Sequence, residues 1–382
     1  MTAGGFELTF GQPGAPLHVA AHSHHPWPDV SFAGQQQAWR DAARLLDHKW
    51  DYMFEHVFPE AQHHIARQLA LPDPASITFG PNTHSFVLRL LSCFPPGRPV
   101  RVLTTQSEFM SFARQIARLE EDRVVTIKRI ATEPFDTFET RFAEAAGRGA
   151  YDLIYFSQVF FDSGFALHDL ERIVRAVRND DTFVVIDGYH GFMAIPVNLH
   201  AIAHRAFYLA GGYKYAMAGE GVCFLHCPPG YGPRPRDTGW YAGFGALESG
   251  GDAVPYAGDG SRFLGATFDV SGLYRFNAVQ DWLQQEGWTP AKILAHVRGI
   301  EHTFLTAIDK TGAALTSAAL AVPDETMRGR FLAFRTAQAG EIVAQLAAQN
   351  IIADYRGDRL RIGFSIYHEN DAALRLAAAL IR

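Results

Sequence analysis

Two neighbouring stretches, VVIDGYHGF (184–192) and AFYLAGGYKYAMAGEG (206–221), decide the fold. Each begins with a run of apolar residues typical of a strand that is buried on both faces, and each continues into Gly-rich sequence with polar side chains. The first apolar run ends at Asp187, and Lys214 follows the second in a turn rich in Gly and Tyr. An acid and a lysine therefore come directly after two predicted strands.

Strand and helix patterns alternate on both sides of these stretches. Apolar strands separated by helices predict an α/β fold with a mainly parallel, doubly wound sheet. Such sheets bind ligands beyond the carboxyl ends of their strands, which is where Asp187 and Lys214 lie. The expected strands are 76–80, 100–106, 124–130, 151–159, 182–187, 206–212 and 222–227, and the expected helices are 31–48, 60–70, 84–93, 111–121, 136–147 and 167–179.

The C-terminal part of the chain has a different pattern. The stretch 228–262 is rich in Gly, Pro and aromatic residues, which indicates a long functional loop or an interdomain crossing. Beyond it, the sequence predicts two helices and then two short strands with a helix between them, which is typical of a smaller α+β unit. The two helices are expected at 272–286 and 290–310, and the strands near 331–335 and 359–366.

The length of 382 residues also favours two domains, because a single hydrophobic core rarely serves so long a chain. We expect a large α/β domain at 30–265 and a small α+β domain at 266–382. Residues 1–29 are expected to pack near the small domain and the entrance to the site. Two packed domains also form a cleft, which is a common place for a ligand.

The composition excludes several classes of protein. With 48% hydrophobic residues, 19% charged residues and a net charge of -6, the chain has the balance of an ordinary globular protein and no basic excess for nucleic acid. No apolar run approaches the roughly 18 residues of a membrane span. The start MTAGGFELTF lacks the basic and apolar regions of a signal peptide. We therefore expect a cytoplasmic protein without nucleic-acid or membrane partners.

The cysteines and histidines predict neither a disulfide framework nor a metal site. Cys93, Cys223 and Cys227 are odd in number and lack paired spacing, so we interpret them as buried small hydrophobic residues. Strand alternation places Cys223 and Cys227 on one face, away from His226, which favours packing. The segment HVAAHSHHPWP (18–28) has close histidines without an acidic or cysteine partner at metal-ligand spacing.

An acid and a lysine at neighbouring strand ends are the two groups that pyridoxal phosphate (PLP) chemistry requires. The lysine amine forms a Schiff base with the cofactor aldehyde. A carboxylate facing the pyridine nitrogen keeps that nitrogen protonated, so that the ring accepts electrons from a substrate carbanion. Lys214 and Asp187 fit these roles. The alternatives are a solvated lysine in a turn and an acid that caps a helix or turn.

The same region resembles the cofactor-lysine region of class V aminotransferase-fold enzymes, and most of all that of the kynureninase branch. The pattern of that branch is an Asp, a His three residues later, and then Tyr-Lys-Tyr with Gly-rich sequence. The matching residues here are Asp187, His190, Tyr213, Lys214 and Tyr215. Weaker similarity is found at 107–112, 156–164 and 354–372. The resemblance implies a PLP-dependent transferase of fold type I, with PLP as the cofactor.

The resemblance implies roles for further residues around the cofactor. Asn82 and Thr83, in GPNTH before a helix, would bind the phosphate, and Tyr213 would add its hydroxyl. The alternative for Asn82 and Thr83 is simple N-capping. His190 would stack on the cofactor ring or hydrogen bond near it, unless it is a core histidine. Phe109 would stack on the ring, unless it is a core phenylalanine.

The resemblance also implies a substrate side and a partner. Arg361, in DRLRIGFS, matches the arginine that holds the substrate carboxylate, and the alternative is a surface strand charge. The N-terminal segment lines the substrate entrance in this family, so His22, His24 or Trp27 would contact substrate. Thr267, in FLGATFDVSG, resembles a Gly-Thr segment that these enzymes lend to the phosphate site of the partner subunit. We therefore expect a homodimer.

The implied reaction takes place at the α-carbon of an amino acid, with Lys214 as the base. A class V aminotransferase-type enzyme is the favoured interpretation, and a kynureninase-like hydrolase that cleaves the Cβ–Cγ bond is the alternative. A PLP-binding protein of the same fold without turnover is a third hypothesis. A desulfurase is disfavoured, because its nucleophilic cysteine lies in the C-terminal third and no cysteine follows Cys227. The segment 265–272 replaces the Ser-Asn-Pro sequence with which kynureninases contact the aryl substrate.

Overall fold

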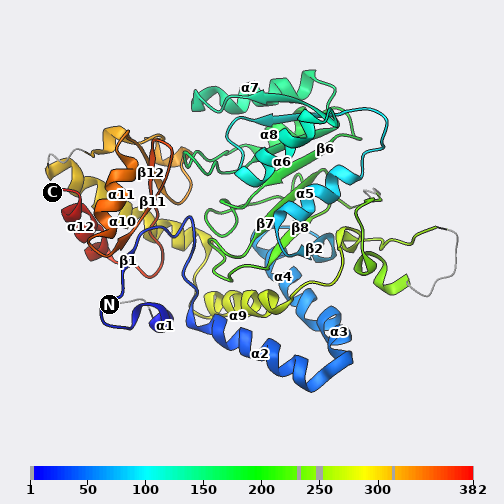
Figure 1. Cartoon of the computed structure of the whole chain (residues 1–382), viewed down its shortest axis with the longest axis horizontal. Helices are drawn as coiled ribbons and strands as arrows, with labels where there is room; N and C mark the ends of the chain where they lie inside the picture. Colours follow the sequence, from blue (N-terminus) through cyan, green and yellow to red (C-terminus); the bar gives the residue numbers. More distant parts are fainter. Residues whose placement is uncertain (1–3, 230–233, 247–252, 312–314, 382) are drawn as a thin grey trace.

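The computed structural model describes residues 4–229, 234–246, 253–311 and 315–381. Its larger sheet has seven strands (Figure 1), which are β2 (Ile77–Gly80), β3 (Val100–Thr105), β4 (Val125–Ile130), β5 (Leu153–Ser157), β6 (Phe183–Asp187), β7 (Ala206–Gly211) and β8 (Cys223–His226). Their order across the sheet is β2-β8-β7-β6-β5-β3-β4. Neighbouring strands are parallel, except that β8 is antiparallel to β2 and β7. The predicted α/β fold with a mainly parallel sheet is confirmed.

Helices lie between most of these strands and continue into the C-terminal part. They are α1 (Glu7–Phe10), α2 (Asp29–Leu45), α3 (Lys49–Tyr52), α4 (Phe58–Leu69), α5 (Thr83–Ser92), α6 (Met110–Glu121), α7 (Phe135–Arg148), α8 (Leu170–Ala176), α9 (Ser271–Gln285), α10 (Pro290–Thr311), α11 (Ala339–Ala347) and α12 (Asn370–Ala379). The helix expected at 167–179 is shorter, because Asp169 caps α8 and Val177 already has extended backbone angles. Across the described ranges, every helix falls short of the length or the apolar character that a membrane span requires.

Different helices cover the two faces of the seven-stranded sheet. Phe183 and Val185 of β6 pack in a hydrophobic cluster with side chains of α5 and α6. Val184 and Ile186 of the same strand pack in a larger cluster with side chains of α4, α7, α8 and α9. Because successive side chains of a strand point to opposite faces, a strand between two helix layers is apolar at every position. This burial explains the continuous apolar runs in the sequence.

The register of the sheet aligns the carboxyl ends of its parallel strands. Ser157 ends β5 and is paired with Asp187, which ends β6. Asp187 is in turn paired with Leu209 of β7. Strand β7 ends at Gly211, and the turn after it carries Lys214. The acid and the lysine are therefore brought to the same edge of the sheet.

The C-terminal part contains a second, antiparallel sheet with the order β11-β12-β9. Its strands are β9 (Leu332–Arg335), β11 (Asp354–Arg356) and β12 (Arg359–Ile362). Near it, β1 (Leu17–His18) pairs in parallel with β10 (Ile351–Ile352), so that the N-terminal segment lies beside the C-terminal part of the chain (Figure 1). The strand expected at 359–366 ends at Ile362. The domain boundaries at 30–265 and 266–382 stay a prediction.

Candidate active site

A cavity of about 1000 Å3 lies at the edge of the sheet that carries Asp187 and Lys214, and both residues line it. The N-terminus of α5 and the chain that follows β3 and β5 form other parts of its wall. Its volume is at the upper end of the usual range for small-molecule sites. Every lining residue lies between positions 82 and 214. All of these residues fall within the range 30–265 that we expect for the large domain.

Lys214 is buried, with 4% of its surface exposed. Its Nζ lies 2.7 Å from Nε2 of His190. The same nitrogen lies 4.7 Å from the ring centroid of Tyr189 and 5.0 Å from that of Phe109. The pKa of Lys214 is lowered to about 7, mainly by burial, with the charge of Asp187 opposing the shift and that of Arg361 adding to it. A substantial fraction of this amine is thus neutral at physiological pH.

Asp187 is buried at the end of β6. The hydroxyl of Tyr155 donates to Oδ2 at 2.7 Å, and the backbone N–H of Tyr189 donates to Oδ1 at 3.0 Å. Burial raises the pKa of this carboxyl, against these two hydrogen bonds and the charge of Lys214. A cationic ring nitrogen facing Asp187 would lower the pKa again and favour the ionised form.

His190 lies in the loop between β6 and β7 and is buried. Its Nε2 contacts Lys214, whereas its Nδ1 has no hydrogen-bond partner among the described residues. Burial holds the pKa of His190 well below its usual value, and the positive charge of Lys214 acts in the same direction. The imidazole is therefore neutral, with one ring nitrogen left for a ligand.

The N-terminus of α5 opens into the cavity. The side chain of Asn82 caps this helix and accepts from the backbone N–H of Ser85 at 2.9 Å, so capping is observed. Asn82, Thr83 and His84 line the cavity, as does Tyr213. The Nδ1 atom of His84 is buried without a partner in the described chain. A helix N-terminus with free N–H groups and an unpaired ring nitrogen suits a phosphate group. Sequence reasoning missed His84, although it follows the GPNT turn directly.

Phe109 and its neighbour Glu108 come between β3 and α6. The ring of Phe109 lines the cavity and meets that of Phe161 edge to face, with centroids 5.5 Å apart. Glu108 is buried, and its carboxylate accepts hydrogen bonds from the hydroxyls of Thr105 and Ser157, each at 2.6 Å. Burial raises the pKa of Glu108 to about 8. Our sequence reasoning chose Phe109 and missed the acid beside it.

The profile of the aminotransferase class-V family matches residues 31–362. The chain belongs to the aminotransferase class-V family. No sequence among curated proteins matches it.

The fold is similar to that of several solved structures. The cysteine desulfurase of Thermococcus onnurineus NA1 has a TM-score of 0.81 at 15% identity, covering 98% of this chain and 96% of that one. C-DES with glycine covalently linked to its PLP cofactor has a TM-score of 0.78 at 15% identity, covering 98% of both chains. The cysteine desulfurase CsdA of Escherichia coli has a TM-score of 0.73 at 16% identity, and the match covers 98% of this chain and 96% of that one.

This membership makes the protein a PLP-dependent enzyme of class V, and PLP is its cofactor. The cavity fits that group, because it combines a buried amine, a carboxylate at a strand end and a helix N-terminus. Lys214, Asp187 and Asn82 are the residues at these three points. The likeness to desulfurases at such low identity concerns the fold. The kynureninase branch stays a prediction.

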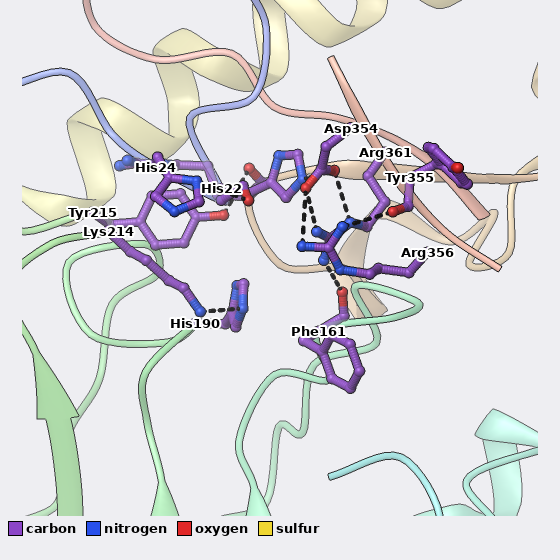
Figure 2. A network of polar contacts seen from close by, with 12 residues as sticks. His22, His24, Phe161, His190, Lys214, Tyr215, Asp354, Tyr355, Arg356 and Arg361 are labelled. Carbon is purple, nitrogen blue, oxygen red and sulfur yellow. Dashed lines mark hydrogen bonds and ion pairs between the residues drawn. The ribbon is translucent and has the colours of Figure 1, made fainter. Parts of the chain in front are cut away.

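The residues expected on the substrate side do not line the cavity of this class V enzyme. Arg361 and His22 are buried beside Asp354, which accepts from Arg361 Nε and lies 2.9 Å from His22 Nε2 (Figure 2). Trp27 is 41% exposed and lies under the guanidinium of Arg275, whose carbon is 5.0 Å from the ring centroid. Asp354 was not anticipated, because its contact with His22 joins residues that are 332 positions apart in the sequence.

Thr267 lies apart from these residues. Its hydroxyl accepts from Nε1 of Trp240 at 2.9 Å, and it lines a second cavity, of about 490 Å3, together with Lys49 and Trp50. A single chain therefore does not bring Thr267 into its own PLP cavity. This placement leaves open the expectation that Thr267 serves the site of a partner subunit.

None of the three cysteines lines the PLP cavity. Cys223 and Cys227 are buried in the cluster with α5 and α6, as strand alternation predicts, and Cys93 is half-buried. His226 points to the opposite face, where its Nε2 lies 2.9 Å from the carbonyl of Ala203. Burial raises the pKa of Cys223 to about 12. A thiol in this state is a poor nucleophile.

One group of possible metal ligands occurs in the described part of the chain, away from the cavity. Glu60 and His64 on α4 lie near Asp281 on α9, with their ligand atoms within 4.8 Å of one another. Arg67 donates to Nδ1 of His64 at 2.7 Å, so the ring hydrogen is on Nε2, which lies 3.3 Å from Asp281. A protonated Nε2 has no lone pair for a metal ion, so this tautomer does not suit metal coordination through that atom.

Proposed function

We propose that the enzyme acts at the α-carbon of an amino acid, in a reaction of the aminotransferase type. The observation that carries this proposal is the buried amine of Lys214, which lines the cavity beside Asp187 and has a pKa of about 7. An amine that is partly neutral at physiological pH can bind the cofactor covalently and can also accept a proton.

Residues of the cavity, and Arg361 beside Phe161, would each have a separate role in this reaction. Bound PLP supplies an electron sink for the substrate carbanion. Asp187 would hold the pyridine nitrogen in its protonated form, and the N-terminus of α5 with Tyr213 would hold the phosphate. The ring of Phe109 would lie against that of the cofactor. Arg361 would bind the substrate carboxylate through its terminal nitrogens.

Proton transfer is assigned to Lys214. With cofactor and substrate bound, Nζ of Lys214 would take the proton from the substrate α-carbon. His190, with Nε2 at 2.7 Å from Nζ in the substrate-free structure, would keep the freed amine close to this position. In transamination, the same amine would return the proton to an atom other than the substrate α-carbon. This reaction requires no cysteine. The absence of a cysteine from the described cavity therefore favours this reaction over a desulfurase.

A kynureninase-like hydrolysis is the second candidate. The observation that favours it is the aromatic wall of the cavity, where Phe109, Phe161 and Tyr189 lie together. The edge-to-face arrangement of Phe109 and Phe161 is suited to packing around an aryl side chain.

The test is a spectroscopic titration followed by product analysis. The purified protein is mixed with PLP, and the visible absorbance of lysine-bound cofactor should appear in the wild type and be absent from Lys214→Ala. Addition of L-alanine, other amino acids and L-kynurenine should then change the spectrum. A keto acid product supports the aminotransferase reaction, and alanine released from kynurenine supports the hydrolase. A stable absorbance that no substrate changes would instead indicate a binding protein without turnover.

A further inference from the structure

Asp354 and Arg361 are directly opposite each other on β11 and β12. Oδ1 of Asp354 accepts from Nε of Arg361 at 2.9 Å, and Oδ2 accepts from Nη2 at 2.5 Å. The carboxylate therefore occupies one edge of the guanidinium in a bidentate arrangement, which fixes both position and orientation. Arg361 is only 2% exposed, whereas the side chain of Asp354 is 18% exposed, so the guanidinium is the more protected partner of this ion pair.

His22 holds Asp354 from the N-terminal segment (Figure 2). Its Nε2 lies 2.9 Å from Oδ1 of Asp354, and its ring stacks on Phe331 with centroids 4.7 Å apart. A Cβ at Gly363 would lie 2.6 Å from Nδ1 of His22, so the ring is confined on that side too. Burial lowers the pKa of His22 to about 4, which makes it a neutral hydrogen-bond donor at physiological pH. Asp354 forms an ion pair with Arg361, and its Oδ2 lies 3.8 Å from Nη2 of Arg356.

The other side of the guanidinium meets the loop that lines the PLP cavity. Nη1 of Arg361 donates to the carbonyl of Phe161 at 2.6 Å, and Phe161 lines the cavity. The bonds to Asp354 and Phe161 use three of the five N–H groups of a guanidinium. The second N–H group on each terminal nitrogen makes no hydrogen bond to the described residues, so a ligand that reaches the guanidinium could accept from it.

We propose that Asp354, supported by His22, is a positioning residue that directs the terminal nitrogens of Arg361 toward the carboxylate of the amino acid substrate. This inference rests on the proposed function, in which Arg361 binds that carboxylate. Because the charge of Arg361 is already balanced by Asp354, the enzyme recognises the carboxylate through the geometry of the remaining N–H groups. His22 then acts on substrate binding through Asp354 and does not need to touch the substrate.

The test compares glycine with methylamine, which lacks the carboxylate. Both are titrated against the PLP-loaded enzyme, and dissociation constants are taken from the change in cofactor absorbance. Asp354→Ala should weaken glycine binding about tenfold and leave methylamine within about twofold. Asp354→Asn should have an intermediate effect, because it keeps one oxygen for Nε and His22 but presents an NH2 group to Nη2. The control is Asp358→Ala, in the turn between the same strands, where the side chain is 65% exposed; it should change neither constant.

Two outcomes would overturn the inference alone, namely an Asp354→Ala variant with unchanged glycine binding, and an equal loss of binding for glycine and methylamine. A wild type that binds glycine and methylamine equally would overturn the proposed role of Arg361 together with this inference. If Asp354→Ala does not fold, the same comparison with Asp354→Asn decides. A wild type that forms no lysine-bound cofactor is a different result, because it refutes the proposed function and this inference together.

Discussion

The amine of Lys214 lies 2.7 Å from Nε2 of His190, and both groups are buried. Because burial lowers the pKa of Lys214 to about 7, its neutral, nucleophilic form should predominate above that pH. The rate at which PLP attaches to the cofactor-free protein should therefore rise between about pH 6 and 8 and level off above. Stopped-flow absorbance over this range measures it. A rate that keeps rising toward the ordinary pKa of lysine, about 10.4, would contradict the prediction.

Tyr155 should influence the pH at which the enzyme works. Its hydroxyl donates to Asp187 at 2.7 Å, while its ring stacks on Phe112 with centroids 3.7 Å apart. Tyr155→Phe keeps the stacking but removes the hydrogen bond to Asp187. In the wild type, that hydrogen bond favours the ionised carboxylate. The pKa of Asp187 should rise, so the acid limb of kcat/KM should move to higher pH, with turnover lower by about tenfold or less at neutral pH.

Asp187→Asn is the stronger variant at the same position. It removes the charge that would face the ring nitrogen of PLP, so turnover should fall by about a hundredfold or more at every pH. An Asp187→Asn enzyme with near wild-type turnover would show that the carboxylate does not serve the cofactor.

The outline of the PLP site is predictable from the sequence because its main residues lie at the ends of apolar strands. Asp187 ends β6 and Lys214 follows β7, and the local pattern that predicts these strands also locates the two residues. Asp354 could not be found in this way, because its role depends on His22, which is distant in the sequence. The short strands β1, β10 and β11 contain too few residues for a detectable periodicity, although they bring His22 and Asp354 together.

The close packing around the ring of His22 can be tested by a substitution at Gly363. A Cβ at Gly363 would lie 2.6 Å from Nδ1 of His22 and 3.1 Å from its backbone nitrogen. Since the stacking on Phe331 prevents the ring from moving away, Gly363→Ala should lower the free energy of unfolding by about 1–3 kcal/mol. The Gly363→Ala variant should also bind the free amino acid glycine more weakly, because His22 supports Asp354. Urea unfolding followed by fluorescence measures the first effect.

Gly299→Ala is the matched control. This glycine lies within α10, and a Cβ there meets no atom within 4 Å. Replacement of an exposed helical glycine by alanine should raise the free energy of unfolding by about 0.5–1 kcal/mol. Equal destabilisation by both substitutions would mean that the contact with His22 is not responsible.

Thr267 provides a test of the proposed homodimer. It lies outside the PLP cavity of its own chain and accepts from Trp240 at 2.9 Å. If it serves the phosphate of the partner subunit, Thr267→Asp should prevent PLP binding by charge repulsion, and Lys214→Ala should be inactive for lack of the amine. Mixed dimers of these two variants contain one complete site, with Lys214 from one chain and Thr267 from the other. Equal mixing should therefore restore about a quarter of the wild-type activity, because half of the dimers are mixed.

The control pairs Lys214→Ala with Asp187→Asn, two residues of the same cavity, so that no mixed dimer has a complete site. This mixture should stay inactive. Activity is measured after unfolding and refolding the variants together, and the dimer is verified by sedimentation. If the Lys214→Ala and Thr267→Asp mixture also stays inactive while its dimers form, Thr267 acts within its own chain. In that case the bond between Thr267 and Trp240 is a local packing feature, and the partner subunit adds no Thr267 to the phosphate site.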